Sequence, residues 1–320
     1  MAYRLSDIDR KNITAFEKDY SRTSLKSILL TQGSIRGLSN FEIVFGYPLA
    51  AIAGRNGSGK STVLALAACA YHSSPKGWGL AGRKYPYYRF SDFFVQTHDE
   101  VAVEGVEVLY GLLYDKWKPT EELPTGQGLG YQRRKKNHGG KWNDYAGRLR
   151  RPVAFFGIDR VVPPSERSVL KNQKNYISYA AGKKSDVEEK TRTSVSRILG
   201  IDYQDFEVRG GGSHKLPVVQ RKTCKYSGFN MGAGEQALFA LFSVIHSAVS
   251  STLFVIDEIE LGLHEAAQRA VIAELKKIAF EKGHQFIFTT HSGAVLDSLA
   301  LEARFFLEST SAGTQVIRSE

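Results

Sequence analysis

Residues 49–62 read LAAIAGRNGSGKST, an apolar run followed by a glycine-rich turn that ends in Lys60 and Ser61. The eight residues that begin at Gly54 fit the pattern G-x-x-x-x-G-K-S of a phosphate-binding loop. Its glycines let backbone N–H groups curl around a phosphate, and the start of the next helix adds a positive end. The apolar run predicts a buried strand, and residues 60–71, rich in Ala and Leu, predict the helix. The sequence therefore predicts an α/β fold of the P-loop NTPase class.

A second motif lies far along the chain. Residues 253–256 are apolar and lead directly into Asp257 and Glu258. Next to a phosphate loop, this pair fits an NTPase in which Asp257 and Ser61 bind Mg²⁺ and Glu258 polarises the attacking water as general base. The alternation of strands and helices over residues 234–307 predicts a largely parallel sheet.

Further motifs narrow the class of NTPase. They are residues 231–236 (MGAGEQ), 257–265 (DEIELGLHE) and 289–292 (TTHS). Together with the phosphate loop, they resemble the ABC-type ATPases of the SMC, Rad50, RecF and OLD group, most closely the OLD-like branch. The resemblance implies an ABC-ATPase head with a mixed sheet, ATP and Mg²⁺ as ligands, and a homo-oligomer with composite ATP sites between protomers.

The resemblance also implies roles for single residues. Catalysis is expected from Glu258 and from His291, the latter as sensor of the γ-phosphate within its own protomer. The residues expected to contact the γ-phosphate held by a neighbouring protomer are Gly232, Gly234 and Glu235. The residues expected to bind ATP in the loop are Arg55, Asn56, Gly57, Ser58, Gly59, Lys60, Ser61 and Thr62. The expected Mg²⁺ residues are Ser61, Asp257 and Gln96, the last as a lid-loop glutamine.

One position departs from the family pattern. Residues 231–236 correspond to the signature segment of this family. Gly232 stands where that segment usually has a serine, so the hydroxyl that would contact the γ-phosphate of a neighbouring protomer is missing. Backbone N–H groups near Gly234 could still serve. Glu260, in the loop after the acidic pair, is expected to line the seam between protomers.

Positive charge is concentrated in the middle of the chain. The 320 residues include 43 Lys and Arg and 33 Asp and Glu. Residues 115–225 hold 24 of the basic and 12 of the acidic side chains, so the remainder is nearly neutral. Residues 115–151 favour a loop or hairpin that contacts DNA or an acidic protein, or a solvated loop without a binding role. The candidate contact residues are Arg133, Arg134, Lys135, Lys136, Lys141, Arg148, Arg150 and Arg151, with Tyr131, Trp142 and Tyr145 among them.

The chain is expected to have three parts. These are an N-terminal ATPase lobe over 1–72, an inserted basic lobe over 73–227 and a C-terminal ATPase lobe over 228–320. The spacing of Ser185 and Glu188 predicts a capped helix. No heptad pattern persists, which excludes a long coiled coil.

Composition favours a cytoplasmic protein. Two cysteines cannot form a disulfide framework, and the charged N-terminus does not fit a signal peptide. Residues 236–256 lack charged side chains but contain His246 and a serine cluster, so we expect a buried helix and strand without membrane contact.

The biological role follows from the resemblance. OLD-like proteins usually carry a TOPRIM nuclease after the ATPase, and this chain ends soon after His291. A separate effector is therefore expected, as in PARIS-like anti-phage systems. The alternatives are a RecF-like or Rad50-like DNA repair ATPase, and a scaffold that binds ATP with little turnover.

Overall fold

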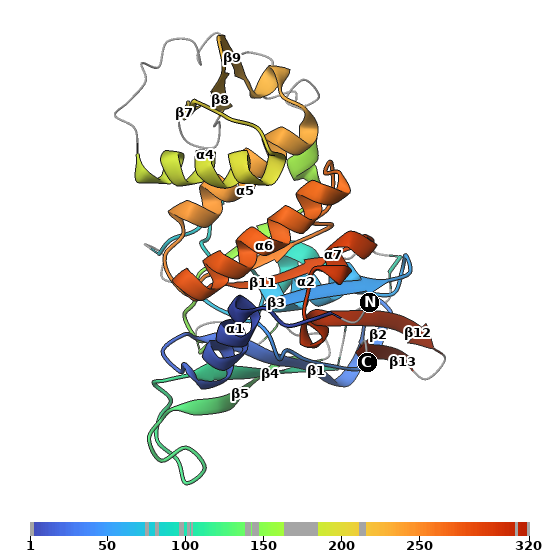
Figure 1. Ribbon diagram of the computed structural model, residues 1–320. Helices are drawn as coiled ribbons and strands as arrows, with labels where there is room; N and C mark the ends of the chain where they lie inside the picture. Colours follow the sequence, from blue (N-terminus) through green and yellow to red (C-terminus); the bar gives the residue numbers. More distant parts are fainter. Residues whose placement is uncertain are drawn as a thin grey trace.

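The computed structural model describes residues 3–73, 77–80, 83–95, 99–100, 103, 105–137, 142, 147–162, 185–210, 216–310 and 313–318. Three residues named above, Gln96, Lys141 and Tyr145, lie outside the described residues. The described strands form three sheets, and the layers follow one another along the long axis of the molecule (Figure 1).

A six-stranded sheet occupies the middle. Its strands, in spatial order, are β13 (Gly313–Arg318), β12 (Arg304–Thr310), β3 (Leu49–Gly54), β11 (Gln285–Thr289), β10 (Leu253–Ile256) and β6 (Val153–Phe156). All neighbouring pairs are parallel except the antiparallel pair of β12 and β13. The carboxyl ends of the five parallel strands therefore meet at one edge of the sheet, where an α/β fold places its ligands.

Each central strand is buried on both faces. In β3, Ala50 and Ile52 pack into one hydrophobic core, while Leu49 and Ala51 pack into a second core on the opposite face. This arrangement explains why the strands read as continuous apolar runs.

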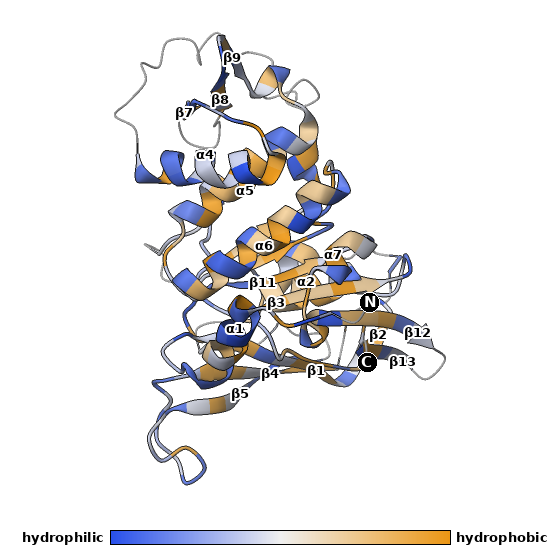
Figure 2. Ribbon diagram, in the orientation of Figure 1, coloured by the Kyte–Doolittle hydropathy of each residue, from blue (hydrophilic) through white to orange (hydrophobic). Residues whose placement is uncertain are grey.

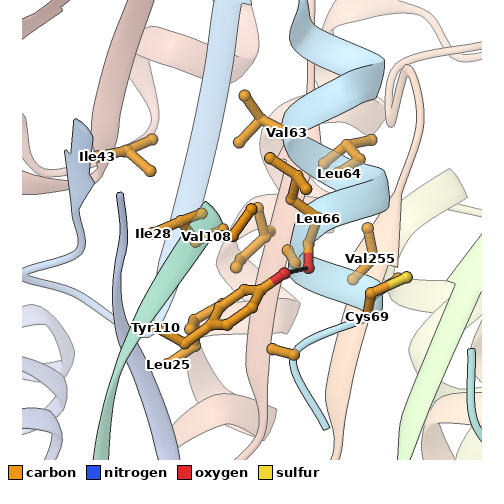
Figure 3. Close-up of a cluster of buried hydrophobic side chains, with 14 of the residues drawn as sticks. Leu25, Ile28, Ile43, Val63, Leu64, Leu66, Cys69, Val108, Tyr110 and Val255 are labelled. Carbon is orange, nitrogen blue, oxygen red and sulfur yellow. Dashed lines mark hydrogen bonds between the residues drawn. The ribbon is translucent and has the colours of Figure 1, made fainter. Parts of the chain in front are cut away.

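The first core is closed by a four-stranded antiparallel sheet. Its strands, in spatial order, are β2 (Leu38–Val44), β1 (Ser24–Ile35), β4 (Val106–Tyr114) and β5 (Gly128–Lys136). Helix α2 (Lys60–Ala68) is buried in this core (Figure 3). There, the Tyr110 hydroxyl donates to the Leu66 carbonyl at 2.9 Å (Figure 3). The phosphate-loop helix is thus fixed between two sheets.

Helices close the second core. The main ones are α5 (Ala233–Ser247) and α6 (Glu265–Lys282), whose hydrophobic sides face inward while hydrophilic residues lie outside (Figure 2). Beyond them, α4 (Asp186–Leu199) packs against α5 and α6. A three-stranded sheet of β7 (Asp205–Arg209), β8 (Leu216–Arg221) and β9 (Cys224–Ser227) completes a projection at this end (Figure 1).

Short helices complete the described structure. They are α1 (Asp7–Lys18), α3 (Phe90–Phe93), α7 (Gly293–Asp297), and the 3-10 helices η1 (Ile158–Val161), η5 (Gly228–Asn230) and η6 (Leu301–Ala303). The capping box of Ser185 and Glu188 is confirmed at the start of α4. Helix α1 was not anticipated, although Ser6 and Asp9 form a capping box there too.

The basic segment, residues 115–151, contributes a strand and buried side chains to the fold. The run Arg133 to Lys136 lies in β5, which forms a hairpin with β4, a strand that precedes the range 115–151 in which a loop or hairpin was expected. Arg134, Arg148 and Arg151 are only 2 to 3% exposed, so the expectation that these three contact DNA or a protein surface is wrong. Buried arginines are retained where the interior supplies acceptors.

The strands of residues 73–227 are distributed over all three sheets. Residues 106–136 complete the antiparallel sheet, residues 153–156 form an edge of the central sheet, and residues 205–227 form the projection. The boundaries at residues 72 and 227 remain a prediction.

The longest described helix, α6, has 18 residues, and the part of the chain that the structure describes contains no long coiled coil. Within that same part, no helix is both long enough and apolar enough to cross a membrane.

Candidate active site

The phosphate loop joins β3 to α2 at the carboxyl edge of the central sheet. Gly54 has a φ of 144°, and a Cβ there would lie 2.5 Å from the Leu307 carbonyl oxygen. Gly59 has a φ of 94° and precedes the first turn of α2. Both positions require glycine because side chains are strained at these angles. The backbone geometry that the motif predicts is therefore present.

Lys60 folds back over the loop. Its Nζ donates to the carbonyl oxygens of Gly54 at 2.9 Å and Arg55 at 3.0 Å. Burial lowers the pKa of Lys60, and the carboxylates of Asp257 and Glu258 oppose this shift. The ammonium group thus lies in the field of the acidic motif, although 197 residues separate Lys60 from Asp257.

Asp257 follows β10 and contacts the start of α2. Its Oδ2 accepts a hydrogen bond from Ser61 Oγ at 3.4 Å, and its Oδ1 accepts one from Thr289 Oγ1 at 2.6 Å. A hydroxyl and a carboxylate that meet in this way are the hard oxygen donors that Mg²⁺ prefers. The pair is therefore chemically suited to a magnesium ion.

Glu258 has an unusual backbone conformation. Its φ is 48°, in the left-handed region that residues other than glycine rarely adopt. The Glu258 N–H donates to Thr289 Oγ1 at 2.7 Å. The Thr289 hydroxyl thereby accepts from Glu258 while donating to Asp257, and it links the two acidic residues to the end of β11.

Arg160 is a site residue that the sequence analysis missed. It lies in η1, directly after β6, the strand that pairs with β10. Its Nη1 donates to the Asp257 carbonyl at 2.5 Å, and its Nη2 donates to the Glu258 carbonyl. The charged pair Asp159 and Arg160 gives no comparable sequence signal, because it lacks the two adjacent carboxylates that marked Asp257 and Glu258.

Two neighbouring loops meet at Glu260 and His291. The His291 N–H donates to Glu260 Oε1 at 2.5 Å, while Glu260 Oε2 is buried without a hydrogen-bond partner among the described residues. His291 itself is exposed. Its imidazole therefore lies at the surface of the same edge, accessible to a ligand.

The signature segment begins helix α5. Gly232 is exposed, and a Cβ there would have no atom within 4 Å. Gly234 is buried, and a Cβ on it would lie 2.0 Å from the Gly262 carbonyl oxygen. Close contact with the loop after the acidic motif therefore requires glycine at position 234, independently of any nucleotide.

Glu235 is bound within its own chain. Its Oε1 accepts hydrogen bonds from the Tyr203 hydroxyl at 2.6 Å and the Tyr226 hydroxyl at 2.7 Å. Burial, together with Glu235, raises the pKa of Tyr226 to about 12, which keeps this phenol protonated as a donor. Tyr203 and Tyr226 belong to the projection, so Glu235 anchors the projection to the signature helix.

Two family models match this chain. One, described as "AAA domain, putative AbiEii toxin, Type IV TA system", matches residues 134–297, and the other, "AAA domain", matches residues 31–209. Each covers more than half of the 320 residues. The chain belongs to the AAA-domain family. This AAA-domain protein is a P-loop ATPase, as the sequence predicted.

Solved structures agree on the fold. The AAA-domain chain is similar to an Smc head bound to the C-terminal winged-helix domain of ScpA, with 18% identity and a TM-score of 0.55. It is also similar to the Pyrococcus furiosus Smc head with an extended coiled coil, bound to the C-terminal domain of ScpA, with 15% identity and a TM-score of 0.55. Each alignment covers 92% of this chain and 96% of the other. The expected ABC-type ATPase head is thereby confirmed as the fold. No curated protein matches the sequence.

The AAA-domain fold brings the predicted residues into two groups. The residues at the carboxyl edge of the central sheet are Arg55, Asn56, Gly57, Ser58, Gly59, Lys60, Ser61, Thr62, Asp257, Glu258 and His291. Within this group, Arg55, Asn56 and Gly57 are exposed, whereas Ser58 and Thr62 are buried. The second group, Gly232, Gly234 and Glu235, lies at the start of α5. Gln96 is outside the described residues.

Proposed function

We propose that this ATPase binds MgATP at the phosphate loop and hydrolyses it in a homo-oligomer with shared sites. The observation that carries the proposal is the contact of Ser61 with Asp257, which joins the loop to the acidic motif at 3.4 Å. Ser61 and Asp257 are the residues that would hold Mg²⁺, which supplies charge neutralisation on the phosphates when bound.

The chain's own groups have distinct roles in this proposal. When ATP binds, Lys60 exchanges its hydrogen bonds to the Gly54 and Arg55 carbonyls for hydrogen bonds to phosphate oxygens. Carbonyl and phosphate oxygens are alternative acceptors for the same ammonium group. Glu258 takes the proton of the attacking water as general base, and His291 contacts the γ-phosphate from the neighbouring strand end. Positioning and charge stabilisation supply most of the rate enhancement.

The signature turn supports the shared site. Gly232 leaves its backbone open to solvent at the start of α5, where N–H groups and the helix dipole favour a phosphate. Glu235 is already engaged by Tyr203 and Tyr226, so we assign it to the fold of the signature turn and leave phosphate contact to the backbone near Gly232 and Gly234.

We further propose that the ATPase is a sensor or regulatory scaffold for a separate effector, a TOPRIM-type nuclease, in anti-phage defence of the PARIS-like kind. The OLD-like motifs 257–265 and 289–292 support this assignment. The description of the matching family, which names a Type IV TA system, is consistent with a multi-component system. Two similar heads were solved with a domain of a partner protein bound.

The decisive experiment measures ATP hydrolysis by the purified chain, with Lys60→Ala as blank, in the presence and absence of duplex DNA. We expect hydrolysis that DNA does not change, and Glu258→Gln to accumulate an ATP-dependent oligomer by light scattering. Hydrolysis at the wild-type rate in Glu258→Gln would refute the base assignment. Strong stimulation by DNA would favour the repair-like alternative.

The effector is tested separately. The chain is expressed with its chromosomal neighbours, and we expect one of them to co-purify with it. Failure of every neighbour to co-purify would reject the separate effector without affecting the proposed ATPase mechanism.

A further inference from the structure

Two consecutive carbonyls of the acidic motif point to one guanidinium. Arg160 donates from Nη1 to the Asp257 carbonyl at 2.5 Å and from Nη2 to the Glu258 carbonyl. Nη1 also donates to the Gly157 carbonyl at 3.0 Å, which gives the guanidinium a third backbone acceptor. A planar fork of this kind holds a pair of acceptors in one defined orientation, unlike the single point charge of a lysine.

The peptide that Arg160 holds is the strained one. Glu258 has a φ of 48°, a conformation that costs energy for any residue with a Cβ and persists only where surrounding contacts impose it. Thr289 Oγ1 holds its N–H at 2.7 Å, and Arg160 holds its carbonyl. The direction in which the Glu258 side chain leaves the backbone is thus set from both sides.

The environment keeps Arg160 in place. Burial lowers the pKa of Arg160, and the carboxylates of Asp257 and Glu260 oppose that shift, so the guanidinium remains charged. Helix η1, which carries Arg160, also packs against the signature helix α5. The element that carries Arg160 therefore lies between the acidic motif and α5, whose N-cap is Gly232.

We propose that Arg160 is a positioning residue that holds the Asp257–Glu258 peptide in its left-handed turn and so aims the general base at the attacking water. Arg160 acts through Glu258 and does not touch the nucleotide. This assignment rests on the proposed role of Glu258, and the experiment separates the two.

The test compares Arg160→Met and Arg160→Lys with wild type in steady-state ATP hydrolysis and in equilibrium binding of a fluorescent ATP analogue with Mg²⁺. We expect Arg160→Met to lower kcat about 100-fold, because loss of alignment at the reacting group has this size of effect. Nucleotide affinity should stay within about threefold. Arg160→Lys should recover part of the rate, since the ammonium keeps a charge and hydrogen-bond donors but lacks the planar fork that fits the two carbonyls.

A matched control is Arg304→Met. Arg304 also donates to a backbone carbonyl, that of Leu299 at 2.7 Å, but it lies at the opposite end of β12 from the site. We expect this variant to keep its kcat. Thermal melting of all variants monitors folding, and Arg160→Lys provides the kinetic test if Arg160→Met does not fold.

Double variants test whether Arg160 acts through Glu258. In a Glu258→Gln background, adding Arg160→Met should lower the residual hydrolysis no further, because residues that act through one another are not additive. The proposal is overturned if Arg160→Met lowers kcat by the same factor in both backgrounds, or if it lowers nucleotide affinity as much as kcat. Wild-type hydrolysis in Glu258→Gln alone rejects the base assignment, and a loss confined to Arg160→Met then assigns Arg160 a route other than Glu258.

Discussion

Two cations of this ATPase make the same type of contact with different consequences. Lys60 donates to the carbonyls of Gly54 and Arg55 at the edge of the central sheet. Arg148 donates to the carbonyls of Cys69 at 2.7 Å and Tyr88 at 3.1 Å in the interior. At Lys60 the acceptors belong to a loop that can exchange them for phosphate. At Arg148 they are buried backbone groups that depend on the arginine.

The difference extends to the whole of each region. In the phosphate loop, the charge of Lys60 lies in the field of the Asp257 and Glu258 carboxylates. The basic segment turns Arg134, Arg148 and Arg151 inward, so much of its charge stabilises the fold. A high local count of basic residues therefore does not define a binding surface until burial is known.

The largest effect is expected at the phosphate loop. Lys60→Ala should abolish detectable MgATP binding and lower hydrolysis roughly 1,000-fold, because the charge that meets the phosphates is lost. Its free energy of unfolding should fall by about 1 kcal/mol, since the buried Gly54 carbonyl loses a donor while the exposed Arg55 can bond to water. Calorimetric ATP titration and urea unfolding measure the two quantities. A variant that retains ATP affinity would place the nucleotide elsewhere.

In the basic segment, substitution of a buried arginine should lower stability. Arg148→Met leaves two buried carbonyls without a donor, and we expect the free energy of unfolding to fall by about 3 kcal/mol. Arg133→Met is the matched control, because the Arg133 side chain is 65% exposed and its ion pair with Glu107 contributes less than about 1 kcal/mol. Urea unfolding measures both. Equal losses in the two variants would break the comparison.

The signature turn offers a comparison of neighbouring glycines. Gly234→Ala forces a Cβ toward the Gly262 carbonyl oxygen, so stability should fall by about 2 kcal/mol. Gly232→Ser has open space and a φ of −62°, and serine is a favourable first residue for a helix, so stability should change by less than about 0.5 kcal/mol.

The rate of ATP hydrolysis tests whether this turn also contacts ATP, in addition to its role in stability. If the signature contacts a neighbour's ATP, Gly232→Ser should raise hydrolysis in the assembled state, since the added hydroxyl can meet the γ-phosphate. The rate is measured against protein concentration. Loss of stability in Gly232→Ser equal to that in Gly234→Ala would contradict the open position of this residue.

The smallest effect concerns pH. Burial, with the charges of Lys282 and Arg151, lowers the pKa of His284 to about 3, and burial with Lys282 lowers that of His246 to about 4. Both rings are neutral when folded, so their contribution is complete above pH 6.5 and is lost as pH falls. Between pH 6.5 and 5.5, His284 should remove about 1 kcal/mol, and His246, whose ring is less buried, should remove less.

Urea unfolding at the two pH values tests this slope. We expect His284→Gln to remove more than half of the histidine contribution, and His246→Gln, whose ring is less buried, to remove a smaller share. A slope that is identical in all three proteins would show that the buried ring does not titrate as expected.

Much of the fold could be predicted from local sequence signals. The strands at 49–54 and 253–256 and the helix from Ser185 were predicted because their signals are short-range, namely apolar runs, glycine turns and caps. Strand β5 was harder, since a run of Arg and Lys is atypical of a strand. In the folded chain β5 pairs with β4, where the buried Arg134 donates to Gln132 of its own strand and Arg133 forms an ion pair with Glu107 of β4.

The candidate site divides in the same way. The sequence pointed to Lys60, Asp257 and His291, because each lies next to a strand end in a recognisable motif. It could not point to Arg160, whose importance depends on β6 lying beside β10. The sequence also could not show that Glu235 is held by two tyrosines of the projection, since Tyr203 and Tyr226 are brought together only by the folding of the segments between them.

The sequence by itself therefore determined the class of fold, the phosphate loop and the acidic motif, because backbone conformation and strand burial follow from neighbouring residues. Only the tertiary structure decided which charges are available to a ligand. Lys60 lies at the carboxyl edge of the central sheet, in the field of Asp257 and Glu258, while Arg148 and Arg151 are enclosed by packed strands and helices. The free energy of a charge depends on the solvent and partners around it, and these are set by the whole fold.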